Sequence, residues 1–286
     1  MGAIDPVPGS PESADGEALA AGDAVEPRVV ERRSGRAQVA VAADLAQELP
    51  IAFEYNGISH AVMLATPADL HDFAVGFSLS EGIATSGQCY GVDVQRNAAG
   101  ITLAIEIAAE AFVQLKARRR TLAGRTGCGI CGTESLDQVL RPLPDLSGIA
   151  LQVTPSALAR AHAGLEAVQP LQRATGAAHV AVWCARDGAV VVAREDVGRH
   201  NALDKLIGAL ARARTDPRDG FALVTSRASV EMVQKSATAG IAVLAAVSAP
   251  TALAVRTAES CGQTLIGFAR GAAFNVYTRP DRLSTG

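Results

Sequence analysis

Aromatic side chains are scarce in this chain of 286 residues, since Phe, Trp and Tyr together make up only 4% of it. A nucleic-acid platform built on base stacking needs more of them, so that class of protein is disfavoured. A strong excess of charge is also missing, because the net charge is −3. The chain therefore has no general attraction to phosphate backbones or anionic membranes, and we expect neither nucleic acid nor membrane among its partners. Any anionic ligand must be held by local groups.

Apolar runs of membrane-spanning length are missing as well. The closest candidate, residues 240–255, contains Ser248, Pro250 and Thr251, which predict a strand, a turn and a helix instead. The N-terminus has no basic stretch followed by an apolar stretch, so no signal peptide is visible. These two absences predict a cytoplasmic protein.

Cysteine is rare too. The five cysteines, at positions 89, 128, 131, 184 and 261, are too few and too scattered for the disulfide scaffold of a small secreted protein. In a reducing compartment a close pair of cysteines usually indicates metal binding or redox and sulfur chemistry. Cys128 and Cys131 form such a pair, so they are the first candidates for a reactive centre.

The chain does contain enough apolar sequence for a sizeable core, with 49% hydrophobic residues against 19% charged ones. The chain length and this ratio of hydrophobic to charged residues fit one large domain or two small ones.

Residues 1–26 carry six acids and no Lys or Arg. We interpret residues 1–36 as a disordered acidic tail and expect folding to start near Gln38. The predicted organisation continues with a smaller N-terminal α+β unit over 37–119, a glycine-rich loop over 120–135 and a C-terminal α/β unit over 136–286.

The first unit is predicted from its turns. Asn56-Gly57 between two apolar runs is a strong hairpin signal and predicts strands over 49–55 and 58–65. Thr66 then supplies a helix N-cap and Pro67 the first helical position, so a helix should run to Glu81. Two further strands over 91–95 and 101–107 and a helix over 110–119 complete this unit.

The second unit alternates strands with helices. Thr154-Pro155 again predicts an N-cap and a first-turn proline. The predicted strands cover 179–184, 189–194, 221–225, 241–247, 264–269 and 274–277, and the predicted helices cover 200–212, 228–239 and 251–260. Such alternation predicts a largely parallel sheet covered by helices.

Three loops of the second unit carry polar groups where a strand ends and a helix begins: residues 195–201, 225–227 and 248–251. In an open parallel sheet such loops gather at the carboxyl ends of the strands, where ligands bind. Helix N-termini attract anions, and Arg199 and Arg227 can add bidentate phosphate contacts. The alternative is local structure, in which Ser226 caps a helix and Asp196 pairs with Arg199. Taken together, the loops favour a crevice for a nucleotide or another phosphorylated ligand.

The cysteine pair lies in the sequence Gly127-Cys128-Gly129-Ile130-Cys131-Gly132. Flanking glycines give the backbone unusual freedom and leave the sulfurs little cover. Arginines at positions 118, 119, 120 and 125 lie just upstream, and nearby cations favour the nucleophilic thiolate. The same arginines are also compatible with a solvated helix end.

Four interpretations of the pair compete. Zinc requires four ligands, and no second pair of cysteines or histidines is evident. A zinc nucleobase deaminase requires His-x-Glu and Pro-Cys-x-x-Cys, and neither motif is present, so that activity is excluded. A thioredoxin-like dithiol belongs at a strand-to-helix junction, whereas this pair lies between two units. A persulfide relay needs an exposed cysteine of low pKa, which suits this loop. Spacing alone does not choose among the remaining three.

Several longer motifs, read in order, resemble the FdhD family of formate dehydrogenase accessory sulfurtransferases. The resemblance covers roughly residues 37–282 and leaves the acidic tail outside. The motifs that carry it are Gly127–Gly132, Arg194–Lys205, Ser226–Ser229, Ser248–Thr251, Gly267–Arg270 and Asn275–Thr278.

The resemblance implies a sulfurtransferase that takes sulfur from a cysteine desulfurase. Its acceptor would be the Mo-bis(molybdopterin guanine dinucleotide) cofactor, bound as a substrate before insertion into formate dehydrogenase. It implies a homodimer and a C-terminal unit with a three-layer α/β fold similar to cytidine deaminase but without its metal site, so no permanently bound metal is expected. Cys128 would bear the persulfide and Cys131 would assist. The implied cofactor contacts are Phe268, Ala269, Arg270, Gly271, Ala272 and Ala273.

Combined with the loops, these expectations give a mechanism. The Cys128 thiolate attacks the donor persulfide, and Ser226, Arg199 and Arg227 help to hold the cofactor in the crevice. His200 would orient the guanine or shuttle a proton, unless it is only a helix-start residue. Two other functions stay open: a non-catalytic carrier of the nucleotide cofactor with a structural or zinc-binding cysteine pair, and a dithiol oxidoreductase.

Overall fold

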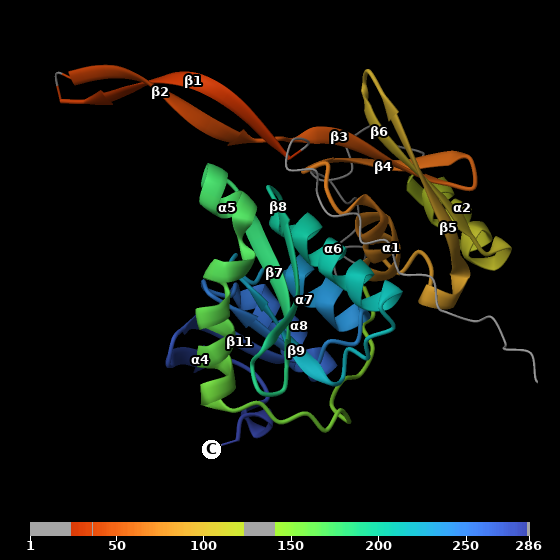
Figure 1. Ribbon diagram of the computed structural model, residues 1–286. Coiled ribbons are helices and arrows are strands. Elements are labelled where there is room, and N and C mark those ends of the chain that lie inside the picture. Colours follow the sequence, from red (N-terminus) through yellow and green to blue (C-terminus); the bar gives the residue numbers. More distant parts are fainter. Residues whose placement is uncertain (1–23, 36, 123–140, 285–286) are drawn as a thin grey trace, which may run out of the picture.

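The computed structural model describes residues 24–35, 37–122 and 141–284. Within these ranges the strands form three sheets, which Figure 1 shows as a projecting two-stranded ribbon, a four-stranded sheet and a six-stranded sheet. The fold is therefore mixed α/β, as predicted. The cysteine pair falls in the segment 123–140, outside the described residues.

The ribbon consists of β1 (Val25–Ser34) and β2 (Ala37–Ala46), which pair antiparallel along their whole length. Folded structure thus begins before Gln38, and the predicted boundary of the tail at residue 36 is wrong. The acids that suggested a tail end at Glu26, after which valines in β1 find partners in β2, such as Val30 opposite Val41. Residues 1–23 lie outside the described residues.

The four-stranded sheet is built on the predicted hairpin. β3 (Leu49–Tyr55) and β4 (Ile58–Ala65) are joined by Asn56 and Gly57, both at positive φ. β5 (Cys89–Asn97) and β6 (Gly100–Ile107) follow, and the strand order is β4-β3-β6-β5. Helices α1 (Leu70–Ser80) and α2 (Ala109–Leu122) and the short turn η1 (Ser86–Gln88) complete the unit. Its core is apolar and aromatic, because Phe73 and Phe77 of α1 pack against Phe53 of β3.

The start of α1 differs from the prediction. The helix begins at Leu70 with Asp69 at the N-cap position, so Thr66 is not the cap and Pro67 is not the first helical residue. The polar atoms of Thr66 are used elsewhere: its hydroxyl accepts the N–H of Val197 and its carbonyl accepts a hydrogen bond from Lys205. Tertiary contacts with the second unit have therefore replaced the local cap.

The six-stranded sheet has the order β12-β11-β10-β9-β7-β8. Its strands are β7 (His179–Ala185), β8 (Val190–Asp196), β9 (Gly220–Val224), β10 (Val243–Ala246), β11 (Thr264–Arg270) and β12 (Ala273–Val276). The helices around it are α4 (Pro155–Gly164), α5 (Pro170–Thr175), α6 (Arg199–Arg212), α7 (Val230–Thr238) and α8 (Ala252–Cys261), with short turns η2 (Glu166–Val168) and η3 (Pro280–Arg282). Thr154 caps α4 as predicted.

The sheet is less parallel than predicted. β9, β10 and β11 are parallel neighbours, but β7 is antiparallel to both β8 and β9, and β12 is antiparallel to β11. For β7 with β8 and for β11 with β12 the cause is local, because the short turns at Asp187-Gly188 and at Gly271 reverse the chain and permit only antiparallel pairing. The pairing of β7 with β9 joins strands that are separated in the sequence by β8 and α6.

Helices cover both faces of this sheet, which gives three layers. Leu203 of α6, Met232 of α7 and Ala258 of α8 share one core, and Leu158 of α4 belongs to the core on the opposite face. A three-layer arrangement agrees with the prediction, while the likeness to cytidine deaminase stays a prediction. Across the described ranges, no helix combines the length and apolar character needed to cross a bilayer.

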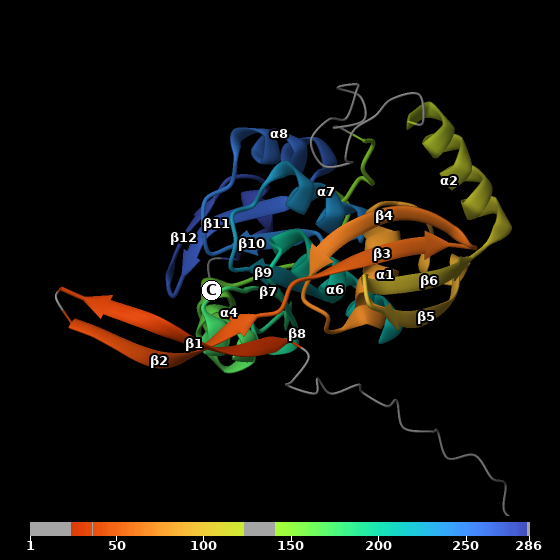
Figure 2. The same ribbon diagram turned by 90° about the horizontal axis from the view of Figure 1, so that it is seen from above.

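The two units meet where α1 crosses α6 (Figure 2). Gly76 of α1 and Gly208 of α6 bring the backbones into direct contact. A Cβ built on Gly208 would lie 1.9 Å from the carbonyl oxygen of Asp72, and one built on Gly76 would lie 1.7 Å from that of Asp204. Only glycine fits at these two positions.

Candidate functional site

The predicted loops do meet at one edge of the six-stranded sheet. Ala228 forms a bridge with Pro250, and the N–H of Thr251 donates to the carbonyl of Ala228 at 3.1 Å. The N–H of Phe268, at the end of β11, donates to the carbonyl of Ser248 at 3.2 Å. The loops that follow β9, β10 and β11 are thus hydrogen-bonded to one another, and they form a continuous polar edge.

The loop after β8 joins this edge through His200. The Nε2 atom of His200 lies 3.2 Å from the Glu231 carboxylate and 3.5 Å from the Ser229 hydroxyl, both at the start of α7. Ser229 in turn donates to Glu231 at 2.9 Å. Ser229 belongs to a motif noted in the sequence, but Glu231 was not predicted. Because both partners face the same ring nitrogen, the cluster lacks the geometry of a nucleophilic triad, in which the acid holds the opposite nitrogen.

Arg199 acts electrostatically on two histidines, His179 and His200. Burial lowers the pKa of His200, and the positive charge of Arg199 lowers it further, while Glu231 acts in the opposite direction. Burial and then Arg199 lower the pKa of His179 as well. The Nε atom of Arg199 is buried without a hydrogen-bond acceptor among the described residues. The edge therefore carries a cation whose Nε atom lacks an acceptor among the described residues, beside an imidazole whose pKa is lowered.

These pKa shifts predict a pH dependence. The pKa of His179 and His200 in the folded state lies below the value of about 6.5 expected in the unfolded chain, so the unfolded chain binds more protons as the pH falls. The associated stability is complete above pH 6.5 and is lost as the pH falls through the folded-state pKa. NMR titration should show that Arg199→Gln raises the pKa of both imidazoles, whereas Glu231→Gln lowers that of His200. An unchanged pKa of His200 in both variants contradicts this electrostatic arrangement.

Ser226 and Arg227 have different roles at the edge. Ser226 is 5% exposed, and its hydroxyl donates to the carbonyl of Arg227, so it shapes the loop. Arg227 is exposed, and the ion pairs found among the described residues do not include it. Its guanidinium is therefore free to meet an anion from solution.

The C-terminal segment contributes an aromatic ring under strain. Phe268 adopts φ of +53°, a left-handed conformation that is costly for a bulky residue, and it is 40% exposed. The pairing of β11 with β12 shifts register at this point. Ala269 is buried, and Arg270 is held by a hydrogen bond to the carbonyl of Val247. Of the last three predicted contacts, Gly271 and Ala272 form the turn into β12 and Ala273 is the first residue of that strand.

Most of the motif Arg194–Lys205 serves to connect the two units through buried polar contacts. Asp196 pairs with Lys205 at 2.6 Å, and both side chains are fully buried. Asp196 does not pair with Arg199, the arrangement considered from sequence; it accepts the N–H groups of Thr66 and Gly198 instead. Only Arg199 and His200 of this motif belong to the polar edge.

A second buried network leads from α6 to the chain that follows the cysteine segment. Asp204 contacts Lys235 at 2.9 Å, and Lys235 contacts Glu81 at 2.5 Å. Arg141, the first residue described after position 140, reaches Glu81 at 3.3 Å and also donates to the carbonyl of Ser80. The network therefore anchors the start of the described segment 141–284 to α1 and α7.

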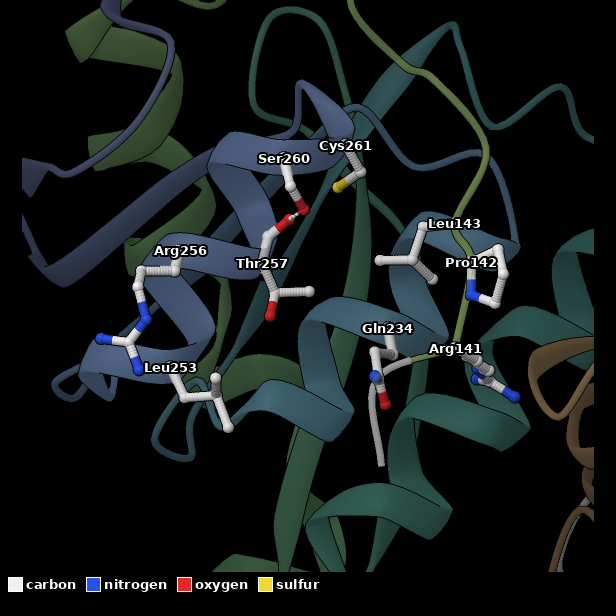
Figure 3. Close-up of a pocket in the computed structure, with 9 residues that line it drawn as sticks. All are labelled: Arg141, Pro142, Leu143, Gln234, Leu253, Arg256, Thr257, Ser260 and Cys261. Atoms are coloured by element: carbon white, nitrogen blue, oxygen red, sulfur yellow. Dashed lines mark hydrogen bonds between the residues drawn. The ribbon is translucent and has the colours of Figure 1, made fainter. Parts of the chain in front are cut away.

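A cavity of about 370 Å³ lies beside this point, between α7 and α8 (Figure 3). Its middle is lined by Leu143, Gln234 and Thr257, and Arg141 and Arg256 stand at its two ends. Figure 3 shows the two guanidinium groups directed away from each other, so they do not converge on one anion. The polar edge is the better candidate for an anionic ligand.

The described cysteines are poor nucleophiles. Burial raises the pKa of Cys184 to about 12 and also raises the pKa of Cys89 and Cys261. All three are free thiols. Groups of His, Cys, Asp or Glu suited to a metal ion are absent from the described part of the chain. Cys128 and Cys131 lie outside the described residues, so their roles stay predictions.

Fold and edge together define a mixed α/β protein with cationic, hydroxyl and aromatic groups at the carboxyl ends of its strands, a place where such proteins bind ligands. Comparison with known proteins gives the family. The chain belongs to the FdhD/NarQ family, whose family model matches residues 46–284. The resemblance predicted from the motifs is confirmed.

Among similar proteins is "Sulfur carrier protein FdhD" of Cupriavidus necator, 57% identical over 242 residues that cover 84% of this chain and 83% of that protein. The protein of the same name from Variovorax paradoxus is 56% identical over 242 residues, which cover 84% and 86% of the two chains. A crystal structure of a putative formate dehydrogenase accessory protein from Desulfotalea psychrophila shares the fold, with a TM-score of 0.71, 21% identity and coverage of 91% of this chain and 99% of that one.

Proposed function

We propose that this protein is a sulfur carrier that supports formate dehydrogenase. Cys128 accepts sulfur from a cysteine desulfurase. The protein then passes this sulfur to its bound substrate, the Mo-bis(molybdopterin guanine dinucleotide) cofactor. The observation that carries the proposal is the membership of the family whose relatives are named sulfur carriers. The assignment to Cys128 is supported by elimination. A carrier needs a thiolate, and the raised pKa of Cys89, Cys184 and Cys261 means that these three thiols resist ionisation. A cytoplasmic homodimer is part of the proposal.

The chemistry is thiol exchange. The Cys128 thiolate attacks the outer sulfur of the donor persulfide, a new S–S bond forms on Cys128, and the donor cysteine leaves with the electron pair of the broken S–S bond as a thiolate. In unloading, the Cys131 thiolate attacks Sγ of Cys128, a Cys128–Cys131 disulfide forms, and the outer sulfur leaves as hydrosulfide with the electron pair of the broken S–S bond, available to the bound cofactor. A thiol reductant then restores both cysteines by a further exchange. The polar edge holds the phosphates of the cofactor through Arg199, Arg227 and the free N–H groups of nearby helix ends.

Sulfur loading is tested directly by mass spectrometry. After incubation with a cysteine desulfurase and cysteine, the wild-type chain is expected to gain sulfur on Cys128, and Cys128→Ala is expected to gain none. Cys89→Ala is the matched control and should load like wild type, because burial raises the pKa of Cys89.

Absence of added sulfur on the wild-type chain, or equal loading of Cys128→Ala, refutes the carrier chemistry. Stoichiometric zinc that can be removed only with loss of folding would favour the alternative, a non-catalytic cofactor carrier with a structural cysteine pair.

Nucleotide binding at the polar edge has its own test. GDP at about 100 times its Kd is expected to raise the melting temperature by roughly 5–10 °C. Arg227→Ala should weaken binding about tenfold and remove about half of that stabilisation, because a charge-assisted contact is lost. Arg160→Ala is the control, since Arg160 is an exposed arginine of α4 paired with Asp187. Equal protection of all three proteins would place the nucleotide elsewhere.

A further inference from the structure

The four-stranded sheet has one covered face and one open face. Helix α1 packs on the covered face through Phe73 and Phe77, which contact Phe53 of β3. The opposite face lies in front of α1 in Figure 2, and none of the described helices covers it. Two large apolar side chains of β4 stay exposed, Val62 at 57% and Leu64 at 56%. The open face is therefore accessible to another molecule.

The pairing register makes these two side chains part of a larger apolar patch. Val62 stands opposite Ala52 and Leu64 stands opposite Pro50, and residues directly opposite in a sheet point to the same face. Thr102 of β6 lies beside Ala52 on the next strand. Pro50 is exposed and Ala52 is half-buried. The open face thus carries a contiguous apolar patch over β4 and β3, and such patches mark places where another molecule binds.

The same face becomes acidic two residues further along β3. Glu54, Ala104 and Asp93 form one row across β3, β6 and β5. Glu106 follows Ala104 by two positions on β6, so its side chain points the same way. The ion pairs found among the described residues include none of these three acids. Their charge is therefore available to a cation on another molecule.

The register places no cation of the described strands on this face. Arg96 of β5 stands opposite the buried Ile101 and belongs to the covered side. The ring of His60 in β4 contacts Phe77, which also lies on the covered side. Uncompensated acids repel a nucleic acid or an anionic membrane. A second copy of the same face would bring no cation to meet the acids, so self-pairing is disfavoured as well.

The occupant that fits this face is an amphipathic helix with basic residues. A helix is about 10–12 Å across and three neighbouring strands span about 10 Å, so one helix covers both the apolar patch and the acidic row. Apolar side chains spaced three and four residues apart form a stripe that can cover Val62 and Leu64. Lysine or arginine beside that stripe has an ammonium or guanidinium on a long stem, which can reach Glu54 and Asp93.

We propose that the open face of the four-stranded sheet is a docking surface for a basic amphipathic helix of a partner protein. Contact with Val62 and Leu64 supplies affinity. The acids Glu54, Asp93 and Glu106 select a cationic partner, because electrostatic complementarity acts mainly on specificity and on the rate of association. The proposal is independent of the sulfur chemistry and of the polar edge, which belongs to the six-stranded sheet.

Calorimetric titration of the full chain with a model helix tests the surface. The probe is a synthetic leucine–lysine peptide of about five helical turns with its leucines on one side, and the control peptide has the same composition without an apolar stripe. Wild type should bind the probe about tenfold more tightly than the control peptide. Val62→Asn and Glu54→Lys should each weaken binding of the probe about fivefold or more.

Matched variants elsewhere on the surface show whether the effect is local. Val191 on β8 is 60% exposed against 57% for Val62, so Val191→Asn should bind the probe like wild type. Glu259 of α8 is an exposed acid, and Glu259→Lys should also bind it like wild type. Hydrogen exchange with bound probe should show protection over residues 49–65 and 100–107. Unchanged thermal unfolding ensures that a variant reports binding, and Leu64→Asn replaces Val62→Asn if the latter is unstable.

Four results overturn the proposal. The first is equal binding of the two peptides by wild type, and the second is a probe Kd that both Val62→Asn and Glu54→Lys leave unchanged. The third is protection from exchange at the polar edge in place of the four-stranded sheet. The fourth is dissociation of a wild-type oligomer by Val62→Asn in sedimentation, which would assign the face to a second copy of this chain.

Discussion

Replacement of Gly208 by alanine is expected to lower the free energy of unfolding by about 3 kcal/mol or more, which corresponds to a fall in melting temperature of roughly 6–12 °C. The added Cβ would lie 1.9 Å from the carbonyl oxygen of Asp72, and neither backbone can yield without separating α1 from α6. Separation would also strain the buried ion pairs that join the two units. Urea denaturation followed by circular dichroism measures the change.

Gly87→Ala is the control for this substitution. A Cβ at Gly87 meets nothing within 4 Å, and its φ is not positive, so stability should change by less than about 0.5 kcal/mol. Equal effects of Gly87→Ala and Gly208→Ala would mean that the contact between the two helices does not limit stability.

Lys205→Met is expected to cost about 3–5 kcal/mol, because it leaves the Asp196 carboxylate buried without its counter-ion. Both side chains are fully buried at a separation of 2.6 Å, and the lysine also donates to the carbonyl of Thr66 at 2.9 Å. The loss therefore affects β8, α6 and the segment before α1 together. Thermal and chemical unfolding of the variant report its size.

The control for the buried ion pair of Lys205 is an ion pair on the protein surface. Arg186 and Asp219 lie 2.9 Å apart with more than half of each side chain exposed, so Arg186→Ala should cost at most about 1 kcal/mol. The double variant Asp196→Asn, Lys205→Met should be more stable than Lys205→Met alone, since the buried charge is gone. A double variant that is no more stable would show that lost packing dominates.

Local signals made much of this fold predictable. Asn56-Gly57 predicted the turn between β3 and β4, and Thr154 predicted the start of α4. Both features could be predicted because a tight turn and a helix cap depend only on residues close by in the sequence. Thr66 carried an equally good cap signal and was misinterpreted, since Lys205 and Val197 engage it from far along the chain. The antiparallel placement of β7 beside β9 likewise depends on long-range packing, which the alternation of strands and helices does not encode.

Some residues of the candidate site could be predicted from the sequence, and others could not. Arg199, Arg227 and Phe268 do lie at one edge, because topology alone brings strand ends together. Glu231 was missed, as nothing in its local sequence relates it to His200, which lies in a different loop. The burial of Lys205 was equally hidden from the sequence, since a lysine in a helix is usually solvated and this one is buried against Asp196, nine residues earlier.

The contact of α1 with α6 has a consequence for how the protein folds as a whole. A fragment that ended before α6 would expose the apolar face of α1, and a fragment that began after Glu81, the residue that follows α1, would leave Lys235 without that partner and expose the backbone at Gly208. Neither half carries a complete set of partners for its buried charges. Calorimetry would then see one cooperative transition, and the smallest autonomous folding unit includes both the four-stranded and the six-stranded sheet.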